Sequence, residues 1–213
     1  LDYSDGAIEG NIFRFNAGGQ GGGMYLNNSP ASLTNNVFTA NASDQGGGIY
    51  LYYSNAALNG NIFEQNTADD SGGGIYLLDS HARIDQNRIL YNLAGQYGGG
   101  LHLSNSSPTL TNNIIADNQS LEAGNGIFIH SPRRLYPPIT LIHNTIARNN
   151  GGYGSGILLA EDTDIVLSNT IIVSHSIGID TGYSNNSAIM EGTLWGSGAW
   201  ANGQDWAGNG TII

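Results

Sequence analysis

The sequence contains no cysteine and no lysine, so all six of its basic residues are arginines. Without cysteine, the chain can have neither a disulfide framework nor cysteine ligands for zinc. Acidic residues outnumber basic ones by 17 to 6, and the formal net charge is -11. Because a nucleic-acid partner requires a basic face to neutralise its phosphates, this balance excludes DNA and RNA as partners.

Long apolar runs are also missing. No stretch of the sequence approaches the ~20 apolar residues that a membrane-spanning helix needs. The first residues lack the basic segment followed by an apolar segment that marks a secretion signal. The 213 residues therefore contain no predicted membrane span and no targeting signal.

Glycine is abundant, with 32 residues, and it recurs in clusters that are each followed by a short apolar and aromatic run. These copies are Gly23–Leu26, Gly48–Leu51, Gly74–Leu77, Gly100–Leu103, Gly126–Ile129 and Gly156–Leu159. They are separated by 25, 26, 26, 26 and 30 residues. Self-similarity at a nearly constant period is typical of repeat architectures.

A second series, Asn-x-(Phe or Ile)-x-x-Asn, runs in phase with the first. Its copies are Asn11/Asn16, Asn36/Asn41, Asn61/Asn66, Asn87/Asn92, Asn113/Asn118 and Asn144/Asn149. A seventh copy starts at Asn169 and carries Ser174 in place of the second asparagine. The aliphatic residues three positions before each first asparagine are Ile8, Leu33, Leu58, Ile84, Leu110, Leu141 and Val166. Two series with one period indicate one coil per repeat.

Each repeat holds two or three runs of alternating apolar and polar residues, separated by Gly, Asn, Ser and Asp. This pattern predicts short strands joined by turns, and no helical periodicity competes with it. Stacked coils would place equivalent residues ~4.8 Å apart in parallel sheets. We therefore expect apolar ladders inside the coil and inward asparagine ladders at its corners, where amides satisfy one another and the turn backbone. The expected apolar ladders are Met24, Ile49, Ile75, Leu101, Ile127 and Ile157, and Phe13, Phe38, Phe63, Ile89, Ile115, Ile146 and Ile171.

These elements and their spacing resemble the right-handed parallel β-helix repeat family, which includes bacterial secreted and surface proteins with polymorphic-outer-membrane-protein-like and pectate-lyase-like repeats. The resemblance extends from Ala7 to about Trp206. It implies an all-β fold, a right-handed parallel β-helix (β-solenoid) of about eight coils of about 25–26 residues each. The handedness follows from the resemblance alone. The family also implies a location outside the cell or at the cell surface.

Residues 1–213 are expected to form a single solenoid that is a section of a longer chain, because neither end shows a capping element. Residues 131–138 form a loop insertion in the one repeat that departs from the usual spacing. Residues 179–213 are expected to form irregular C-terminal coils, whose three tryptophans cover the last core layer. Open strand edges at the two ends predict self-association.

Alternation along each strand predicts an outward aromatic column that could bind carbohydrate, because sugar rings stack on aromatic faces. Its residues are Tyr25, Tyr50, Tyr76, His102 and Phe128, with Tyr52 and His130 in the neighbouring outward column. The alternative is that these rings stack on one another and shield the strands. Polysaccharide or a surface glycan is the partner that this column predicts.

Acidic residues recur before the glycine clusters, at Asp44, Asp69 and Asp70 and again at Glu122. Stacked carboxylates attract a hard cation such as Ca²⁺. Gln20, Gln96, Tyr97 and Tyr153 interrupt the column, so a solvated acidic loop is the alternative. Apart from this Ca²⁺, no cofactor is predicted.

The loop insertion contains the only adjacent basic pair, Arg133 and Arg134. Beside His130, this pair could hold an anionic uronate or sulfate. The alternative is an ion pair between one of these arginines and the acids of the following coil, Glu161, Asp162 and Asp164.

Asp79, His81 and Arg83 form the other mixed acidic and basic group, close to Asp85. Pectate-lyase-like enzymes resemble one another in using carboxylates to hold Ca²⁺ and an arginine as base, although these residues do not match that motif position by position. The leading hypothesis is a non-catalytic extracellular or cell-surface solenoid, acting as a stalk, adhesin or matrix scaffold with weak carbohydrate binding. A polysaccharide lyase or hydrolase is the alternative. The near-constant repeat favours the first, because active sites of this fold interrupt the repeat.

Overall fold

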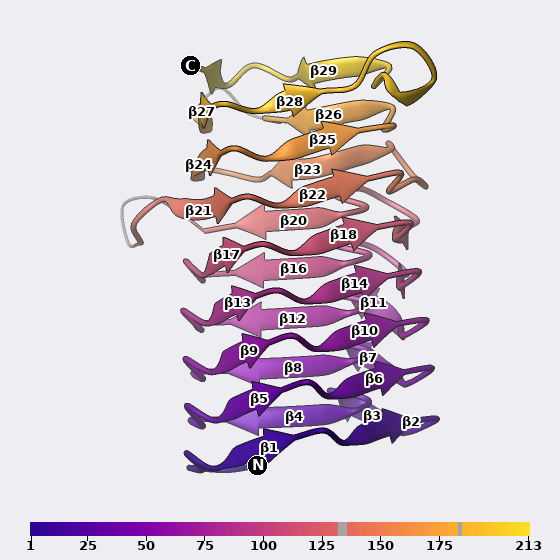
Figure 1. The fold of residues 1–213 in the computed structure, drawn as a ribbon, viewed down its shortest axis with the longest axis vertical. Helices are drawn as coiled ribbons and strands as arrows, with labels where there is room; N and C mark the ends of the chain where they lie inside the picture. The colour runs from indigo at the N-terminus through magenta and orange to yellow at the C-terminus, as the bar shows by residue number, and fades with distance from the viewer. Residues whose placement is uncertain (132–135, 183–184) are drawn as a thin grey trace.

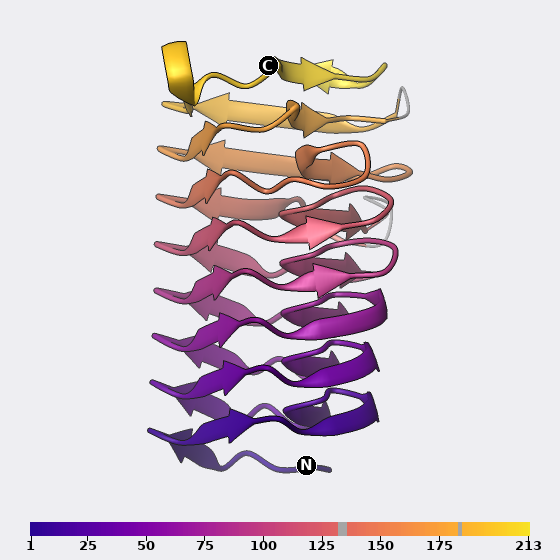
Figure 2. The same ribbon diagram turned by 90° about the vertical axis from the view of Figure 1, so that its right-hand side faces the viewer.

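The computed structural model describes residues 1–131, 136–182 and 185–213. The chain forms a column of coils stacked along one axis, with the strands of successive coils side by side (Figures 1 and 2). Neighbouring strands pair in parallel and in register, as where Phe63 pairs with Phe38 and Ile89. The sheets of eight strands correspond to about eight coils, which confirms the predicted fold class.

Four sheets run along the column. Sheet 1 contains β1 (Ala7–Glu9), β5 (Ser32–Thr34), β9 (Ala57–Asn59), β13 (Arg83–Asp85), β17 (Thr109–Thr111), β21 (Ile139–Ile142), β24 (Asp164–Ser168), β27 (Ser187–Glu191) and β30 (Thr211–Ile212). Sheet 2 contains β2 (Ile12–Arg14), β6 (Val37–Thr39), β10 (Ile62–Glu64), β14 (Arg88–Leu90), β18 (Ile114–Ala116), β22 (Thr145–Ala147), β25 (Ile171–Val173) and β28 (Leu194–Trp195).

Sheet 3 is shorter and was not expected from the sequence. It contains β3 (Ala17–Gln20), β7 (Ala42–Gln45), β11 (Thr67–Ser71), β15 (Leu93–Ala94) and β19 (Gln119–Ser120). Sheet 4 contains β4 (Met24–Asn27), β8 (Ile49–Tyr52), β12 (Ile75–Leu78), β16 (Leu101–Ser104), β20 (Ile127–His130), β23 (Ser155–Leu159), β26 (Ile177–Asp180) and β29 (Gln204–Ala207). The sequence predicted two or three strands per coil, but the first five coils have four. The strands of sheet 3 were not predicted because they lack a clear apolar alternation.

The corners beside sheet 2 are built from a left-handed residue followed by an inward asparagine. Gly60, with φ of +65°, precedes Asn61, and Gln65, with φ of +55°, precedes Asn66. The same conformation recurs at Gln86 before the next corner asparagine. A non-glycine residue in this region costs roughly 1–2 kcal/mol, so the surrounding structure must hold it in place.

Hydrogen bonds of the buried asparagines hold these corners. The Asn61 side chain donates to the Leu33 carbonyl over 2.9 Å and to Asn87 Oδ1 over 3.1 Å. Its own Oδ1 accepts from the backbone N–H and the Nδ2 of Asn36. Asn66 makes the corresponding contacts in the second column. Both asparagines are fully buried, which confirms the predicted amide ladders.

A third ladder lines the corner between sheets 4 and 1, and the sequence analysis missed it. Its hydroxyls accept the backbone N–H of the preceding coil, as where Ser54 N–H donates to Ser80 Oγ over 2.9 Å. The members are Ser29, Ser54, Ser80, Ser106, Ser131 and Thr163, and the side chain of Asn186 continues the series. Serines recur in the sequence at nearly the same period as the asparagines, and this recurrence could have predicted the third ladder.

The fourth corner, between sheets 3 and 4, is made of the repeated glycines. A Cβ atom added to Gly48 would lie 2.6 Å from the Gly74 carbonyl oxygen of the next coil. The same conflict arises at Gly23 against Gly48. The glycine clusters are therefore a packing requirement that each coil repeats.

The core is a continuous set of apolar ladders. Ile49, Ile75 and Leu101 are fully buried in one ladder. In another, the rings of Phe38 and Phe63 stack with centroids 4.8 Å apart and an interplanar angle of 6°. These ladders confirm the predicted inward positions through the sixth coil.

In the seventh coil the predicted alignment is wrong by one residue. Ile146 pairs with Ile172, not with Ile171, and Ile172 is the fully buried member. Thr170 and His175 therefore replace the two corner asparagines of this coil, because Thr170 Oγ1 bonds the Leu141 carbonyl and the His175 ring contacts Asn149.

Leu167 likewise occupies the aliphatic position predicted for Val166, because it pairs with Leu141. At each of these sites two apolar residues are consecutive in the sequence, so the repeat pattern could align either of them with the core position.

The coils from residue 179 onward keep their strand register. Trp195 packs against the core, and Trp206 pairs with the fully buried Ile179 and lies 6.3 Å from the Trp195 ring, so these two tryptophans cover the last layer as expected, whereas Trp200 is 59% exposed. The one helical segment among the described residues is the three-residue 3₁₀ helix η1 (Gly198–Trp200). No helix in the described ranges is long and apolar enough to cross a membrane.

Candidate functional site

The aromatic column predicted on sheet 4 exists as a ladder of stacked rings. Tyr50 and Tyr76 stack with centroids 4.8 Å apart and an interplanar angle of 5°. Tyr76 and His102 stack at 4.5 Å and 13°. Tyr25 and Phe128 extend the ladder at its two ends with more tilted rings.

The middle of this ladder is closed to solvent, so the expectation of open ring faces is wrong there. Tyr50 is 3% exposed, and Tyr76 and His102 are each 8% exposed. Burial raises the pKa values of the Tyr50 and Tyr76 hydroxyls. Each ring face is covered by the next ring of the ladder. This arrangement matches the alternative, in which the rings stack on one another and shield the strands. Glycan binding by this column stays a prediction, and stacking of a sugar is sterically open only at its ends.

The neighbouring column contains the half-buried Tyr52 and His130. Tyr52 packs against Tyr53, with ring centroids 4.4 Å apart. His130 borders a hollow of about 380 Å³ that is also lined by His102 and Glu161. Burial lowers the pKa of His102 to about 3, so this histidine is neutral at physiological pH. Its Nδ1 has no hydrogen-bond partner among the described residues.

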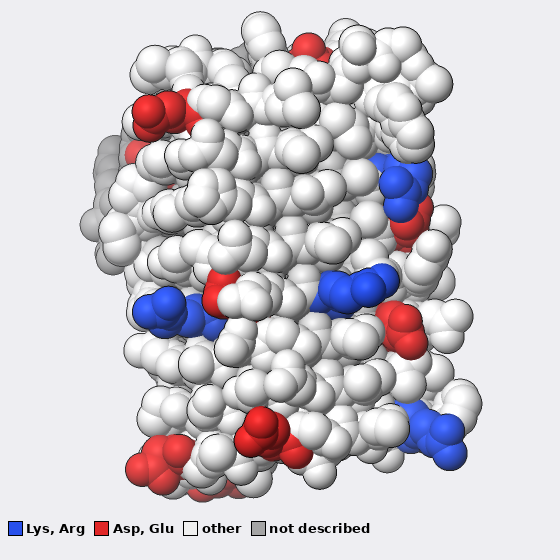
Figure 3. All heavy atoms as spheres, in the orientation of Figure 1, with Lys and Arg blue, Asp and Glu red and all other residues white. Residues whose placement is uncertain are grey.

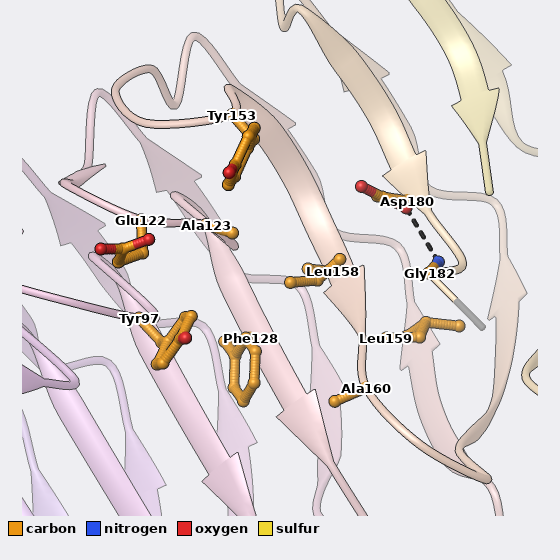
Figure 4. A pocket seen from close by; sticks show the side chains of 10 residues that line it. All are labelled: Tyr97, Glu122, Ala123, Phe128, Tyr153, Leu158, Leu159, Ala160, Asp180 and Gly182. Atoms are coloured by element: carbon orange, nitrogen blue, oxygen red, sulfur yellow. Dashed lines mark hydrogen bonds between the residues drawn. The ribbon is translucent and has the colours of Figure 1, made fainter.

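The aromatic ladder ends in a larger hollow of about 550 Å³ on the outer side of sheet 4. Figure 4 shows Tyr97 and Phe128 on one side of it and Tyr153 on another, with Glu122 and Asp180 at opposite margins. The rings of Tyr97 and Phe128 stack with centroids 4.6 Å apart. Tyr153 is 71% exposed.

Two changes along the column create this hollow. Sheet 3 ends with β19, so the coils above it lose the strand that flanks sheet 4. The outer column also loses its rings, because Phe128 pairs with Leu158 and Leu158 pairs with Asp180. In the sequence, Tyr97 and Tyr153 stand out only as interruptions of the acidic column, and that pattern assigns them to no site.

The three catalytic candidates do not meet at one centre. Tyr136, which lies within the loop insertion, donates to Asp79 Oδ1 over 3.3 Å, and its ring lies 5.4 Å from the His81 ring. His81 Nδ1 lies 3.1 Å from the backbone nitrogen of Ser107, which donates to it. Arg83 instead borders a separate hollow of about 230 Å³.

Asp85 lies beside Arg83 but is engaged elsewhere. Thr111 Oγ1 donates to its carboxylate over 2.5 Å and Asn112 Nδ2 does so over 3.0 Å. The Thr111 hydrogen bond is the main cause that lowers the pKa of Asp85, whereas Arg83 contributes least. This carboxylate is held as a structural acceptor.

The residues of the acidic column differ in exposure and in their partners. Asp44 and Asp69 are exposed, and Asp70 accepts from Gln45 Nε2 over 2.9 Å and from Ser71 Oγ over 3.2 Å. In the described part of the chain, no three carboxylate or imidazole groups gather as cation ligands. Asp44 and Asp70 line one hollow of about 510 Å³, and the Ca²⁺ site stays a prediction.

Arg133 and Arg134 lie outside the described residues. The predicted anion site at this pair, and the alternative ion pair with the acids of the following coil, therefore stay predictions. His130, which was expected to assist them, lies at the end of β20.

Comparison with known proteins identifies the architecture but no individual relative. A family model for the right-handed β-helix region matches residues 1–154. No curated protein and no solved structure gives a significant match. The strands from β24 to β30 continue the same sheets beyond the matched residues.

Proposed function

The chain belongs to the right-handed β-helix family, and we propose that it is a non-catalytic solenoid of the extracellular space or cell surface that serves as a stalk, adhesin or matrix scaffold. The fold alone does not select this role, since one fold hosts many functions. The proposal rests on how the polar groups of this chain are used.

The main support for this role is the continuity of the three corner ladders. From Asn36 to Asn149, the asparagines at both corners of sheet 2 bond the coils above and below them. The serine ladder runs in parallel through the same coils. Side chains that are committed to holding successive coils together suit a rigid spacer, whereas a catalytic site requires polar groups that converge on a substrate.

Surface charge supports the same role. Arginines and acids are scattered over the face of Figure 3 and form no continuous field. Arg148 pairs with Asp117 of the preceding coil through two hydrogen bonds of 2.8 and 2.7 Å. Charged groups of this kind fix neighbouring coils to each other. They provide no broad surface for an anionic polymer.

Assays for turnover test the proposal. The purified chain is incubated with polygalacturonate, alginate and neutral glycans, with and without Ca²⁺, and unsaturated products and new reducing ends are measured. We expect no turnover in any condition. Turnover that is lost in His81→Ala or Arg83→Ala, but kept in the matched surface variant Arg88→Ala, would establish the polysaccharide lyase or hydrolase alternative.

The location is tested separately. In producing cells, antibody labelling should be equal for intact and permeabilised cells if the solenoid is displayed at the surface, or the protein should appear in the medium if it is released. Labelling that requires permeabilisation contradicts an extracellular scaffold.

A further inference from the structure

We propose that the hollow between Tyr97, Phe128 and Tyr153 is a binding site for a glycan segment that carries amino sugars. This inference deepens the scaffold function proposed above by naming its partner, and it rests on that function only for the extracellular setting. The site shares Phe128 with the predicted aromatic column but extends beyond it, because Tyr97 and Tyr153 belong to neither repeated outward column.

The hollow offers aromatic faces that the closed part of the ladder does not. In the closed part of the ladder, each ring is covered on both sides, as Tyr76 is by Tyr50 and His102. At the hollow the series stops, because the position above Phe128 is occupied by Leu158. Tyr153 projects from a loop and is 71% exposed. Rings with an uncovered face can stack on the C–H face of a sugar.

The charged groups at the hollow are acidic. Glu122 and Asp180 stand at opposite margins of the hollow (Figure 4), and Glu161 lines the adjoining hollow that shares Tyr97 and Phe128. No arginine lines either hollow among the described residues. Carboxylates accept hydrogen bonds from sugar hydroxyls, attract protonated amines and repel uronates and sulfates. The lining therefore favours an amino sugar over an acidic one.

The hollow has a rigid floor and a size that suits a ligand. Phe128 and Leu158 alternate with the core residues Ile127, Ile129 and Ile157, all fully buried, so the floor of the hollow is anchored to the core. Its volume of about 550 Å³ falls within the range of about 300–1,000 Å³ that is common for small-molecule sites. A site built on strands is preorganised and loses little entropy when a ligand binds.

Binding is measured by calorimetry at about pH 6 with three probes of equal length: chitosan oligosaccharide, its N-acetylated form and oligogalacturonate. We expect the amine-bearing probe to bind best, the N-acetylated probe about threefold to tenfold more weakly and oligogalacturonate not measurably. Tyr153→Ala should weaken the first two by about threefold to tenfold, because it removes one stacking face.

Two variants test the charges. Asp180→Asn keeps an acceptor for the Gly182 N–H, which now donates to Asp180 Oδ1 over 2.8 Å. Together with Glu122→Gln, it should abolish the preference for the amine-bearing probe and leave the N-acetylated probe little changed. Asp44→Asn removes an exposed carboxylate elsewhere and should leave both affinities unchanged, which separates site binding from general attraction to a chain of net charge -11.

Tyr91→Ala is the matched aromatic control. Tyr91 is 59% exposed at a left-handed corner whose equivalent in the second coil is Ala40. Equal losses in Tyr91→Ala and Tyr153→Ala, equal binding of oligogalacturonate, or equal binding of a basic oligopeptide would overturn the proposal. Absence of binding with no turnover defeats this site and leaves the scaffold function intact, whereas turnover of the bound probe defeats the scaffold function.

Discussion

The outer side of sheet 4 contains two regions built from the same residue types with opposite results. From Tyr50 to His102 the rings are stacked and closed, and Tyr50 is 3% exposed. Around Tyr153 the aromatic residues border an open hollow, and this ring is 71% exposed. Aromatic residues that recur at the repeat period therefore cover one another's faces, whereas aromatic residues outside the period keep faces exposed to solvent.

Truncation of one ring in each region should give the largest difference in the free energy of unfolding. Tyr50→Ala opens a gap between Tyr25 and Tyr76 and should destabilise the fold by about 3 kcal/mol. Tyr153→Ala removes an exposed ring and should change stability by less than about 0.5 kcal/mol. The free energy of unfolding from urea denaturation checks both values, and similar losses would mean that the two regions do not differ as described.

The corner ladder can be broken in the same way. Asn61→Ala leaves the Leu33 carbonyl and the Asn36 N–H without their side-chain partner and should destabilise by about 1–3 kcal/mol. Asn59→Ala, in the same coil but exposed, is the control and should cost less than about 0.5 kcal/mol. The midpoint of denaturation distinguishes them. A tolerated Asn61→Ala would show that the ladder does not hold the coil.

Two buried histidines, one in the closed region and one at a corner of the seventh coil, should also make the fold sensitive to acid. Burial lowers the pKa of His102 to about 3 and that of His175 to about 4, from 6.5. The folded chain therefore binds fewer protons than the unfolded chain below pH 6.5, and stability falls as the pH decreases towards these values. At about pH 4.5 the loss should be on the order of 2 kcal/mol for each histidine.

His102→Phe tests this assignment, because phenylalanine continues the stack between Tyr76 and Phe128 without a titrating group. Stability measured from pH 7 to about pH 4.5 should fall less steeply in this variant than in the parent chain. An unchanged slope would mean that His102 already titrates near its usual pKa.

Association through strand edges is the smallest effect expected. In the first coil, β1 to β3 have neighbouring strands on one side only in this chain, whereas residues 1–3 pair along part of the second side of β4. Unpaired edges template contacts with other strands. The sedimentation coefficient should increase with concentration, and Ile12→Lys, which places a charge on β2, should reduce the increase. A concentration-independent monomer would contradict the prediction.

Much of the architecture followed from periodicity. Asparagines at two fixed positions identified both corners of sheet 2, and Ile or Phe two residues later identified the core, as at Asn61 and Phe63. Where neighbouring apolar residues are interchangeable, as at Ile171 and Ile172, the pattern could not choose, and the alignment was wrong by one residue.

The candidate site was less accessible to such reasoning. Alternation correctly placed Tyr50 and Tyr76 outside the core, yet it could not show that each would cover the other's face. Nor could it show that the end of sheet 3 at β19 would leave a hollow beside Phe128.

By itself, the sequence determined a stack of equal coils, because like residues repeated every 25 or 26 positions can satisfy one another in ladders. Only the tertiary structure decided which outward residues meet solvent. The exposure of a ring such as Tyr76 or Tyr153 depends on what lies in the coils above and below it, and those neighbours are 22 or more residues away in the chain, as Ile177 is from Ser155. The burial of an outward ring is therefore determined by how the coils stack and not by the sequence of its own strand.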